Sequence, residues 1–200
     1  NKVFAAYENE TFALKLERDV ILVDGPDAGT YLQGQLTQDV LAMEEGESVW
    51  SFLLNPDGKV NAWLRVNQIG ESQYLLDVDR DFGEAVIARL LRFKLRTDCE
   101  LILEKWDGVT IVGKDASSYV GNSSLRQIVA QSAWHKISSV DVIGGDTKSL
   151  LNRFPEPKQS FDFLRIINVI PKMGTELHAK VIPAETGLVE KSVSFTKGCY

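Results

Sequence analysis

Residues 48–69 read SVWSFLLNPDGKVNAWLRVNQI, and this stretch decides the fold. Two runs rich in apolar, aromatic and β-branched residues, Ser48–Leu54 and Lys59–Ile69, flank the sequence Asn55-Pro56-Asp57-Gly58. Proline presets the first angle of a turn and glycine accepts a positive φ, so this tetrapeptide predicts a tight turn. The stretch therefore predicts a β-hairpin.

The segments on both sides of the hairpin add further strands and helices. Thr11–Val23 is typical of a strand, and Gln73–Val78 predicts another. Asp24 or Asp27 is placed to cap a following helix. Asp79–Arg96 predicts the clearest helix, because apolar residues recur at helical spacing (Phe82, Val86, Leu90, Phe93).

The rest of the chain continues this mixture. Helices are predicted from Gly144-Gly145-Asp146 to Leu151 and over Lys158–Ile170, where Pro171 ends the second one. Strands without a regular βαβ succession predict an α+β fold. We expect two related, intertwined α+β units, roughly 1–112 and 113–200. The strands predicted in this part are Glu100–Leu103, Val109–Val112, Gln127–Ala133, Lys136–Ile143 and Ser192–Phe195.

The composition is that of an ordinary globular protein, with 44% hydrophobic and 25% charged residues and a net charge of −6. An acidic chain argues against a surface built to coat nucleic acid, because phosphate binding requires clustered Lys and Arg. One local cluster is the exception, and we interpret it as a solvated helix face, with a basic patch as the alternative. It consists of Arg89, Arg92, Lys94 and Arg96.

The cysteine content and the hydropathy bear on the compartment. Two cysteines are too few for a disulfide framework, which favours a reducing, cytoplasmic setting. The sequence has no apolar run of the roughly 18 residues that span a bilayer, and no basic-then-apolar signal at its start. The chain begins with Asn1 rather than Met and ends inside a motif-like stretch, so we expect both ends to be truncated.

The common catalytic signatures are missing from the sequence. It holds no Gly-rich phosphate loop, no GxSxG and no HExxH motif. His135 and His178 have no Cys or His at metal-binding spacing, so no metal site is predicted.

Cys199 stands out because Lys197-Gly198 precedes it. A nearby cation favours the thiolate form, which is nucleophilic, oxidisable and able to bind metals. The alternative is an inert, packed cysteine, which is also our interpretation of Cys99. Lys197 and Cys199 are therefore the candidate catalytic pair.

Several separated stretches together resemble the YgfZ family, the folate-binding relatives of the glycine-cleavage aminomethyltransferase (the T protein, GcvT). The family signature continues past Tyr200 to Gly-Gln-Glu and a C-terminal β-barrel, neither of which this sequence contains. The resemblance covers essentially the whole chain but only the first part of the family's protein. The stretches are YLQGQLTQDV (31–40), LNPDGKV (54–60) with LRV (64–66), LRFKLR (91–96), LRI (164–166), Ile182-Pro183 and Lys197-Gly198-Cys199-Tyr200.

The resemblance implies linked α+β subdomains around a central pocket for tetrahydrofolate or a one-carbon derivative of it. Aminomethyltransferases carry paired aspartates in the hairpin strand, and the matching positions here are Asn61 and Ala62. Their glutamate after Leu-Arg-Leu is matched by Ile167. Because an amide or a methyl group cannot relay a proton as a carboxylate does, we expect no aminomethyl transfer of the glycine-cleavage type.

The implied pocket also gives candidate cofactor-binding residues. Leu64 and Val66 are expected to line an apolar wall, and Asp77 is expected to accept hydrogen bonds from pterin N–H groups. Arg165 is expected to pair with a ligand carboxylate or, alternatively, with a neighbour on its own helix. Each candidate can also be an ordinary strand or loop residue. The full set is Asn61, Leu64, Val66, Asp77, Arg165 and Glu185.

Three functions follow as hypotheses. The resemblance implies a tetrahydrofolate-binding accessory protein for iron–sulfur cluster assembly or repair, with iron–sulfur enzymes or assembly proteins as clients and tRNA modification as a downstream effect. Cys199 would react with, or briefly ligate, a sulfur or iron species or a one-carbon adduct. The alternatives are a one-carbon transferase on another substrate and a non-enzymatic interaction module without folate. No direct nucleic-acid or membrane contact is expected.

Overall fold

The computed structural model describes residues 2–119 and 121–198. The chain forms two compact units, each built from two separated segments. Unit 1 consists of Asn1–Arg18 and Trp106–Pro171, and unit 2 consists of Asp19–Lys105 and Lys172–Tyr200. The sequence predicts one boundary near residue 112, whereas the chain passes between the units three times.

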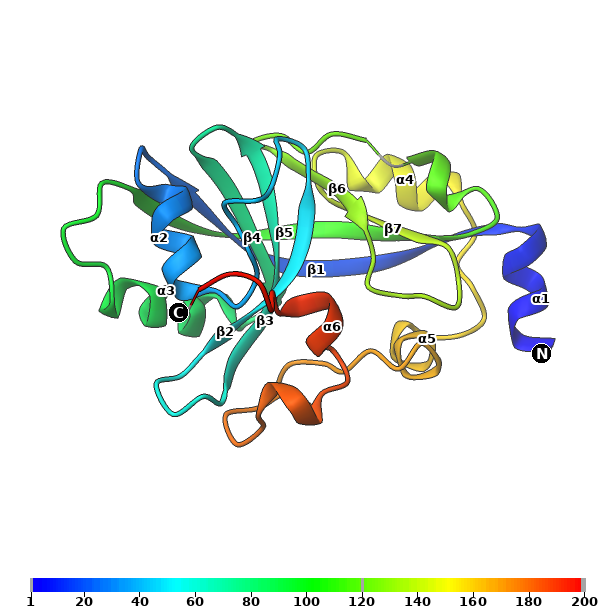
Figure 1. Cartoon of the computed structure of the whole chain (residues 1–200). Coiled ribbons are helices and arrows are strands. Elements are labelled where there is room, and N and C mark those ends of the chain that lie inside the picture. Colours follow the sequence, from blue (N-terminus) through cyan, green and yellow to red (C-terminus); the bar gives the residue numbers. More distant parts are fainter. Residues whose placement is uncertain (1, 120, 199–200) are drawn as a thin grey trace. The chain divides into compact units, whose positions relative to one another are not determined.

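Unit 2 is built on an antiparallel meander of three strands (Figure 1). These are β2 (Ser48–Leu54), β3 (Val60–Gly70) and β4 (Gln73–Asp79). Their order in unit 2 is β2-β3-β4, followed by β1 (Thr11–Asp24) and β5 (Glu100–Gly113), the two strands that run from one unit into the other. The predicted hairpin of residues 48–69 is confirmed.

The turn of this hairpin forms for the reasons that its sequence suggests. Gly58 adopts a φ of +78°, which a side chain would disfavour, and its N–H donates to the carbonyl of Asn55 at 2.9 Å. The N–H of Asn55 in turn donates to the carbonyl of Lys59 at 2.8 Å. The turn is thus closed by its own backbone.

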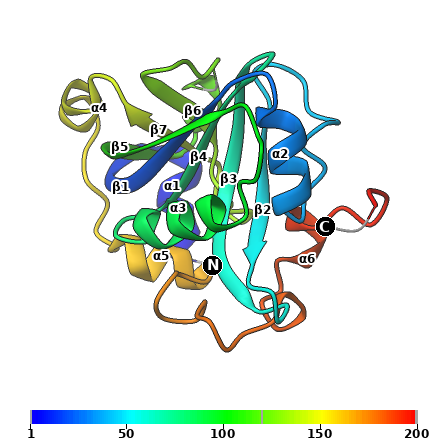
Figure 2. The ribbon, with the colours of Figure 1, turned by 90° about the vertical axis from the view of Figure 1, so that its left-hand side faces the viewer.

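The helices of unit 2 are arranged around the meander. Figure 2 looks at the unit from the side of α2 (Ala28–Gln35) and α3 (Gly83–Arg92), which are joined by a hydrogen bond of 2.6 Å from the Tyr31 hydroxyl to the Leu90 carbonyl. The short helix α6 (Val189–Ser192) contacts β2 and follows the 3₁₀ turn η2 (Pro183–Glu185).

Unit 1 carries the strand order β1-β5-β7-β6, with β6 (Gln127–Gln131) and β7 (Ser139–Gly144) antiparallel. One apolar cluster joins Val109 and Ile111 to Val140 and Val142, and a second surrounds Leu14. The helical elements of the unit are α1 (Lys2–Asn9), η1 (Ala116–Tyr119), α4 (Thr147–Arg153) and α5 (Phe161–Ile167). Together, the antiparallel strands and the helices of both units confirm the predicted α+β class.

Several predicted boundaries are wrong, and each has a local cause. The α3 helix begins at Gly83 rather than Asp79, because Asp81 has a φ of +73° and the buried carboxylate of Asp19 accepts the Gly83 N–H at 2.9 Å. The α5 helix ends at Ile167, since Asn168 caps it and Val169 has a φ of +58°.

Four predicted strands also differ. Glu100–Leu103 and Val109–Val112 are parts of the single strand β5. The second strand around the Trp134-His135 turn begins only at Ser139. Ser192–Phe195 is no strand, because Ser192 is the last residue of α6. No helix among the described residues is long and apolar enough to cross a membrane.

Candidate functional site

The face of the meander towards α6 carries a cluster of polar and aromatic side chains, which we call the Trp–Arg cluster. Alternation along a strand sends every second side chain to the same face, and register aligns those faces between strands. Trp50 pairs with Arg65 across β2 and β3, and Arg65 pairs with Asp77 across β3 and β4. Trp63 and Asn67 lie two positions from Arg65 on β3, so all five share one face.

A buried ion pair forms the centre of the cluster. Arg65 Nε lies 2.9 Å from Asp77 Oδ2, and Arg65 Nη2 lies 3.2 Å from Asp77 Oδ1. Asn67 Nδ2 donates to the same carboxylate at 2.9 Å, while its Oδ1 accepts a 2.6 Å bond from the Ser48 hydroxyl. Arg65 is 1% exposed and Asp77 is 0% exposed. This bidentate, additionally hydrogen-bonded geometry is what a buried charge requires.

Two tryptophans lie beside the ion pair. The rings of Trp50 and Trp63 stack with centroids 4.1 Å apart and an interplanar angle of 21°. The Arg65 guanidinium lies 5.0 Å from the centroid of Trp50, within cation–π range. Trp63 Nε1 donates to the Ser192 hydroxyl at 2.9 Å, which fixes α6 over this face. Trp63 is buried, whereas Trp50 stays partly exposed, so Trp50 is the accessible edge of the cluster.

Thr37 connects α6 and the segment after it to the edge of the sheet. Its hydroxyl accepts the Phe52 N–H at 2.9 Å and donates to the Ser192 carbonyl at 2.6 Å. The Thr37 carbonyl accepts the Ser194 N–H at 2.9 Å. Because Thr37 is fully buried, these bonds are shielded from water and hold the segment in place.

Lys197 points its ammonium group at the end of α2. Its Nζ lies 2.6 Å from the carbonyl oxygen of Gln33, 2.5 Å from that of Leu36 and 3.3 Å from that of Gln38. A cation at the carboxyl end of a helix is favoured by the helix dipole and by the unsatisfied carbonyls. Burial lowers the pKa of Lys197, and the nearby Asp39 carboxylate acts in the opposite direction.

This geometry gives Lys197 a structural role that the sequence does not predict. Its three bonded carbonyls anchor the carboxyl-terminal segment of the described chain to α2. Cys199 lies outside the described residues, so its proposed pairing with Lys197 stays a prediction.

The predicted cofactor-binding residues on β3 and β4 do not all lie on one face. Leu64 and Val66 are fully buried, and alternation along β3 directs them to the face opposite the Trp–Arg cluster. Asp77 lies in the cluster itself. Asn61 Nδ2 donates to Asn55 Oδ1 at 3.1 Å, whereas Asn61 Oδ1 is buried and accepts no hydrogen bond from any described residue.

The other two predicted residues have local partners. Glu185 accepts the Ile182 N–H at 3.1 Å and so closes the η2 turn. Arg165 belongs to unit 1, where its Nε lies 2.9 Å from Asp162 Oδ1 and its Nη1 donates to the Ile170 carbonyl at 3.1 Å. Of the two alternatives considered for Arg165, the structure shows the pairing with a neighbour on its own helix, Asp162.

Sequence reasoning missed Trp50, Trp63, Arg65 and Asn67. A signal was present, because Arg65 is the one charged residue of β3, a strand that is buried almost throughout. A charged residue in such a strand requires a partner of opposite charge. A search for that partner among neighbouring strands would have led to Asp77.

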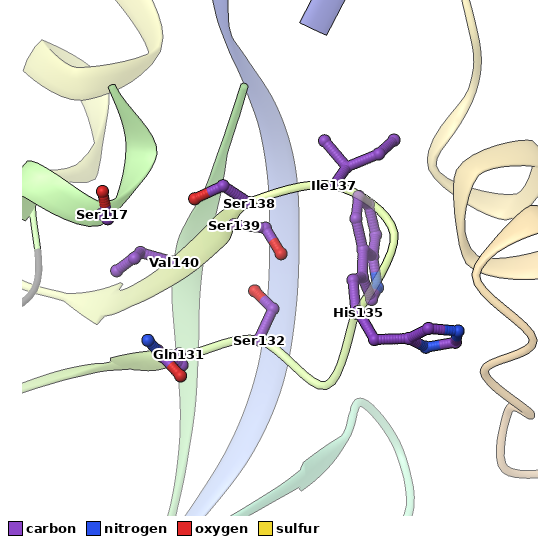
Figure 3. Close-up of a pocket in the computed structure, with 9 residues that line it drawn as sticks. Ser117, Gln131, Ser132, His135, Ile137, Ser138, Ser139 and Val140 are labelled. Carbon is purple, nitrogen blue, oxygen red and sulfur yellow. The ribbon is translucent and has the colours of Figure 1, made fainter. Parts of the chain in front are cut away.

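Unit 1 contains a separate hollow of about 310 Å³ beside the loop between β6 and β7 (Figure 3). Hydroxyl groups dominate its lining, with Ser117, Ser132, Ser138 and Ser139 among the residues. In Figure 3 the His135 ring projects away from these hydroxyls. The lining contains no carboxylate or ammonium group. In the part of the chain that the structure describes, no three His, Cys, Asp or Glu side chains gather as a metal site.

Comparisons with known proteins agree with this fold. No family model matches the chain. The structure is similar to the glycine cleavage system aminomethyltransferase T from Bartonella henselae, with a TM-score of 0.65 and 17% identity over 76% of this chain and 47% of that one. The predicted GcvT/YgfZ-like fold is thereby confirmed.

Three relatives show the range of similar sequences. An uncharacterized protein of Haemophilus influenzae is 27% identical over 90% of this chain and 62% of its own length. The mitochondrial iron–sulfur cluster assembly factor IBA57 homologue of Neurospora crassa is 24% identical over 92% of this chain and 46% of its own length. An aminomethyltransferase of Clostridium botulinum is 23% identical over 61% of this chain and 30% of its own length.

The chain is thus similar, in sequence and in fold, to the GcvT/YgfZ-like superfamily. The chain spans only part of these relatives: 62% of the length of the Haemophilus influenzae protein and 46% of the length of the Neurospora crassa homologue.

Proposed function

We propose that this chain is the tetrahydrofolate-binding part of a YgfZ-like accessory factor for iron–sulfur cluster assembly or repair. One observation carries the proposal. Similarity to an iron–sulfur cluster assembly factor extends over 92% of the chain, whereas similarity to an aminomethyltransferase extends over 61%. In sequence, the assembly factor therefore matches parts of the chain that this aminomethyltransferase does not match.

The β2-β3-β4 meander has groups that suit a folate. A pterin ring is flat and rich in hydrogen-bonding atoms, so it needs an aromatic or guanidinium surface and a few fixed polar groups. Trp50 offers a partly exposed ring beside Arg65. Asn61 Oδ1 is a buried acceptor that no described residue uses. Such an unsatisfied oxygen is costly unless a ligand or water donates to it.

The same residues disfavour aminomethyl transfer. By the resemblance, Asn61 and Ala62 match the positions of the paired aspartates, and the Asn61 amide donates to Asn55. No carboxylate is therefore present there to hold or relay a proton. In our proposal the chain binds the one-carbon carrier without performing the glycine-cleavage reaction.

Cys199 is the reactive group of the proposal. It would contact a sulfur or iron species on a client, and Lys197 would position the segment that carries it. A single cysteine does not hold a cluster alone, so any cluster would be shared with an iron–sulfur enzyme or assembly protein. Effects on tRNA modification would follow through such clients. The proposed setting is the cytoplasm, where a thiol stays reduced.

Calorimetric titration with tetrahydrofolate tests the binding step. The wild-type chain is expected to bind in the micromolar range, about −8 kcal/mol. Trp50→Leu should weaken binding by roughly tenfold or more, because the exposed aromatic edge is lost. Trp134→Leu in unit 1 is the matched control and should bind as the wild type does. No heat with the wild-type chain would favour the non-enzymatic module.

Complementation tests the cellular role. Cells lacking the native protein should regain iron–sulfur enzyme activity with the wild-type gene and not with Cys199→Ser. Full rescue by Cys199→Ser would show that the proposed role does not require the Cys199 thiol. Turnover of a methylamine donor with tetrahydrofolate would instead support the transferase alternative.

A further inference from the structure

The carboxyl end of α3 exposes apolar side chains in an unusual number. Leu91 is 51% exposed, Phe93 is 39% exposed and Leu95 is 80% exposed, all within five consecutive residues. Single exposed apolar residues are normal on a protein surface, but a contiguous group marks an interaction site. The group lies wholly within unit 2.

Four cations surround these apolar residues, and they lack acidic partners. Arg89 donates to the Leu54 carbonyl at 3.0 Å and to Gln35 Oε1 at 3.1 Å, and Lys94 donates to the Thr97 carbonyl at 3.0 Å. These acceptors are neutral. Within residues 2–119 and 121–198, no ion pair is formed by Arg89, Arg92, Lys94 or Arg96. The four cations are therefore not engaged in ion pairs within the described part of the chain, whose full sequence has a net charge of −6.

The backbone next to the exposed apolar residues is strained at Arg96. Arg96 has a φ of +50°, a left-handed conformation that side chains rarely adopt and that costs on the order of 1 kcal/mol. Leu95, directly before it, is the most exposed of the large apolar residues in the group. Residues held in this conformation recur at functional sites.

The chemistry of the surface selects a protein partner over a nucleic acid. Nucleic-acid surfaces combine cations with open aromatic rings on which bases stack. Here the Phe93 ring is already covered by cations, with the Arg89 guanidinium 4.2 Å and the Arg92 guanidinium 5.7 Å from its centroid. The freely exposed groups, Leu91 and Leu95, are aliphatic and suit aliphatic side chains.

We propose that residues 89–96 form a docking surface, the basic–aliphatic patch, for an acidic segment of a partner protein. Carboxylates of the segment pair with the four cations, and its leucine-type side chains cover Leu91 and Leu95. Electrostatic attraction speeds the encounter and apolar burial holds the complex. This inference does not depend on folate binding or on Cys199.

Fluorescence anisotropy with a defined probe tests the proposal. The probe is a labelled peptide of about 14 residues with leucines at i, i+3, i+4 and i+7 and glutamates elsewhere. A second peptide has serine in place of each leucine, and a third has lysine in place of each glutamate. The first probe should bind in the micromolar range and should weaken as salt is raised. The serine and lysine peptides should bind roughly tenfold more weakly or worse.

A pair of matched variants locates the binding. Arg92→Glu/Leu95→Ser should weaken the first probe at least roughly tenfold. The control Leu125→Ser/Arg126→Glu changes another exposed Leu–Arg pair, in unit 1, where Leu125 is 50% exposed, and should leave binding unchanged. Urea unfolding of both variants should match that of the wild type, since the altered side chains are exposed.

Other results would overturn the proposal. Equal binding of the serine peptide would show a merely electrostatic surface, and equal loss in both variants would show that the patch is not the site. A wild-type dimer that becomes monomeric in Arg92→Glu/Leu95→Ser would assign the patch to a second copy of the chain. Binding of a single-stranded RNA that the same substitution abolishes would assign it to nucleic acid.

Discussion

The ammonium nitrogen of Lys197 lies 2.6 Å from the carbonyl oxygen of Gln33, so a lysine near the carboxyl end of the sequence closes the end of a helix that begins at Ala28. The contact spans 164 residues of sequence. It explains how the segment that leads to Cys199 is held: the cation satisfies carbonyls that the last turn of α2 leaves without partners.

Removal of the Lys197 ammonium group should release this segment. In Lys197→Met the carbonyls of Gln33 and Leu36 lose a charged donor, at a cost of about 1–3 kcal/mol of unfolding free energy. Hydrogen exchange at the Ser194 amide, which donates to Thr37, should become faster. Lys180→Met, at an exposed position, is the control. Unchanged exchange at Ser194 in Lys197→Met would show that the anchor lies elsewhere.

Asp77→Asn should be among the most destabilising single substitutions of the Trp–Arg cluster. It removes the carboxylate charge that pairs with the buried Arg65 guanidinium, which costs about 3–5 kcal/mol. Arg65→Met/Asp77→Leu removes both charges and should be milder than Asp77→Asn alone. Urea unfolding of the wild type and of these two variants measures the free energy of unfolding of each. The exposed pair of Asp57 and Lys59 is the control, and Asp57→Asn should leave the midpoint unchanged. A small effect of Asp77→Asn would mean that water reaches the pair.

Two glycine substitutions should have opposite signs. Gly113 has a φ of +120°, and a Cβ there would overlap the Glu10 carbonyl oxygen, so Gly113→Ala should lose more than about 2 kcal/mol. Gly34 lies inside α2 with open space around its Cα, so Gly34→Ala should gain about 0.5–1 kcal/mol. Thermal unfolding of both variants checks the sign of each change. A loss in Gly34→Ala would show that α2 does not tolerate the side chain.

The fold was predictable where its signals are local. The hairpin of residues 48–69 follows from a turn whose hydrogen bonds join residues three or four positions apart. The start of α3 was not predictable, because it depends on Asp19, which is 64 residues away in sequence. Propensity and spacing describe neighbours along the chain, whereas a buried carboxylate that caps a distant helix depends on the tertiary fold.

The candidate site was less accessible to sequence reasoning for the same reason. The role of Asp77 in pterin binding stays a prediction, whereas its partners were not predicted: register places Arg65 opposite it, and that guanidinium and Asn67 hold the carboxylate. The pairing of Lys197 with Cys199 stays a prediction, and the bonds from the Lys197 ammonium group to the end of α2 were not predicted. Cross-strand register and the direction of a long side chain are not encoded in spacing along the sequence.

Selective alkylation should distinguish the two cysteines. Burial raises the pKa of the Cys99 thiol above its ordinary value, with Lys94 acting in the opposite direction, and the side chain is 5% exposed. Because the thiolate is the reactive form, iodoacetamide at about pH 8 should modify Cys99 in the folded protein at least roughly tenfold more slowly than Cys199. In urea both should react at similar rates, as mass spectrometry of tryptic peptides would show.

The raised pKa also has a consequence for stability. A thiol whose pKa is raised by folding contributes stability that is present below its ordinary pKa and is lost as pH rises through the folded-state pKa. The urea midpoint of unfolding should therefore decrease as the pH is raised above about 9. In Cys99→Ala this decrease should be smaller over the same pH range. Cys199→Ser is the control and should keep the wild-type pH dependence. An equal change of the midpoint with pH in the wild type and in Cys99→Ala would show that the pKa of Cys99 does not change on unfolding. In the alkylation experiment, faster modification of Cys99 than of Cys199 would contradict the burial of Cys99.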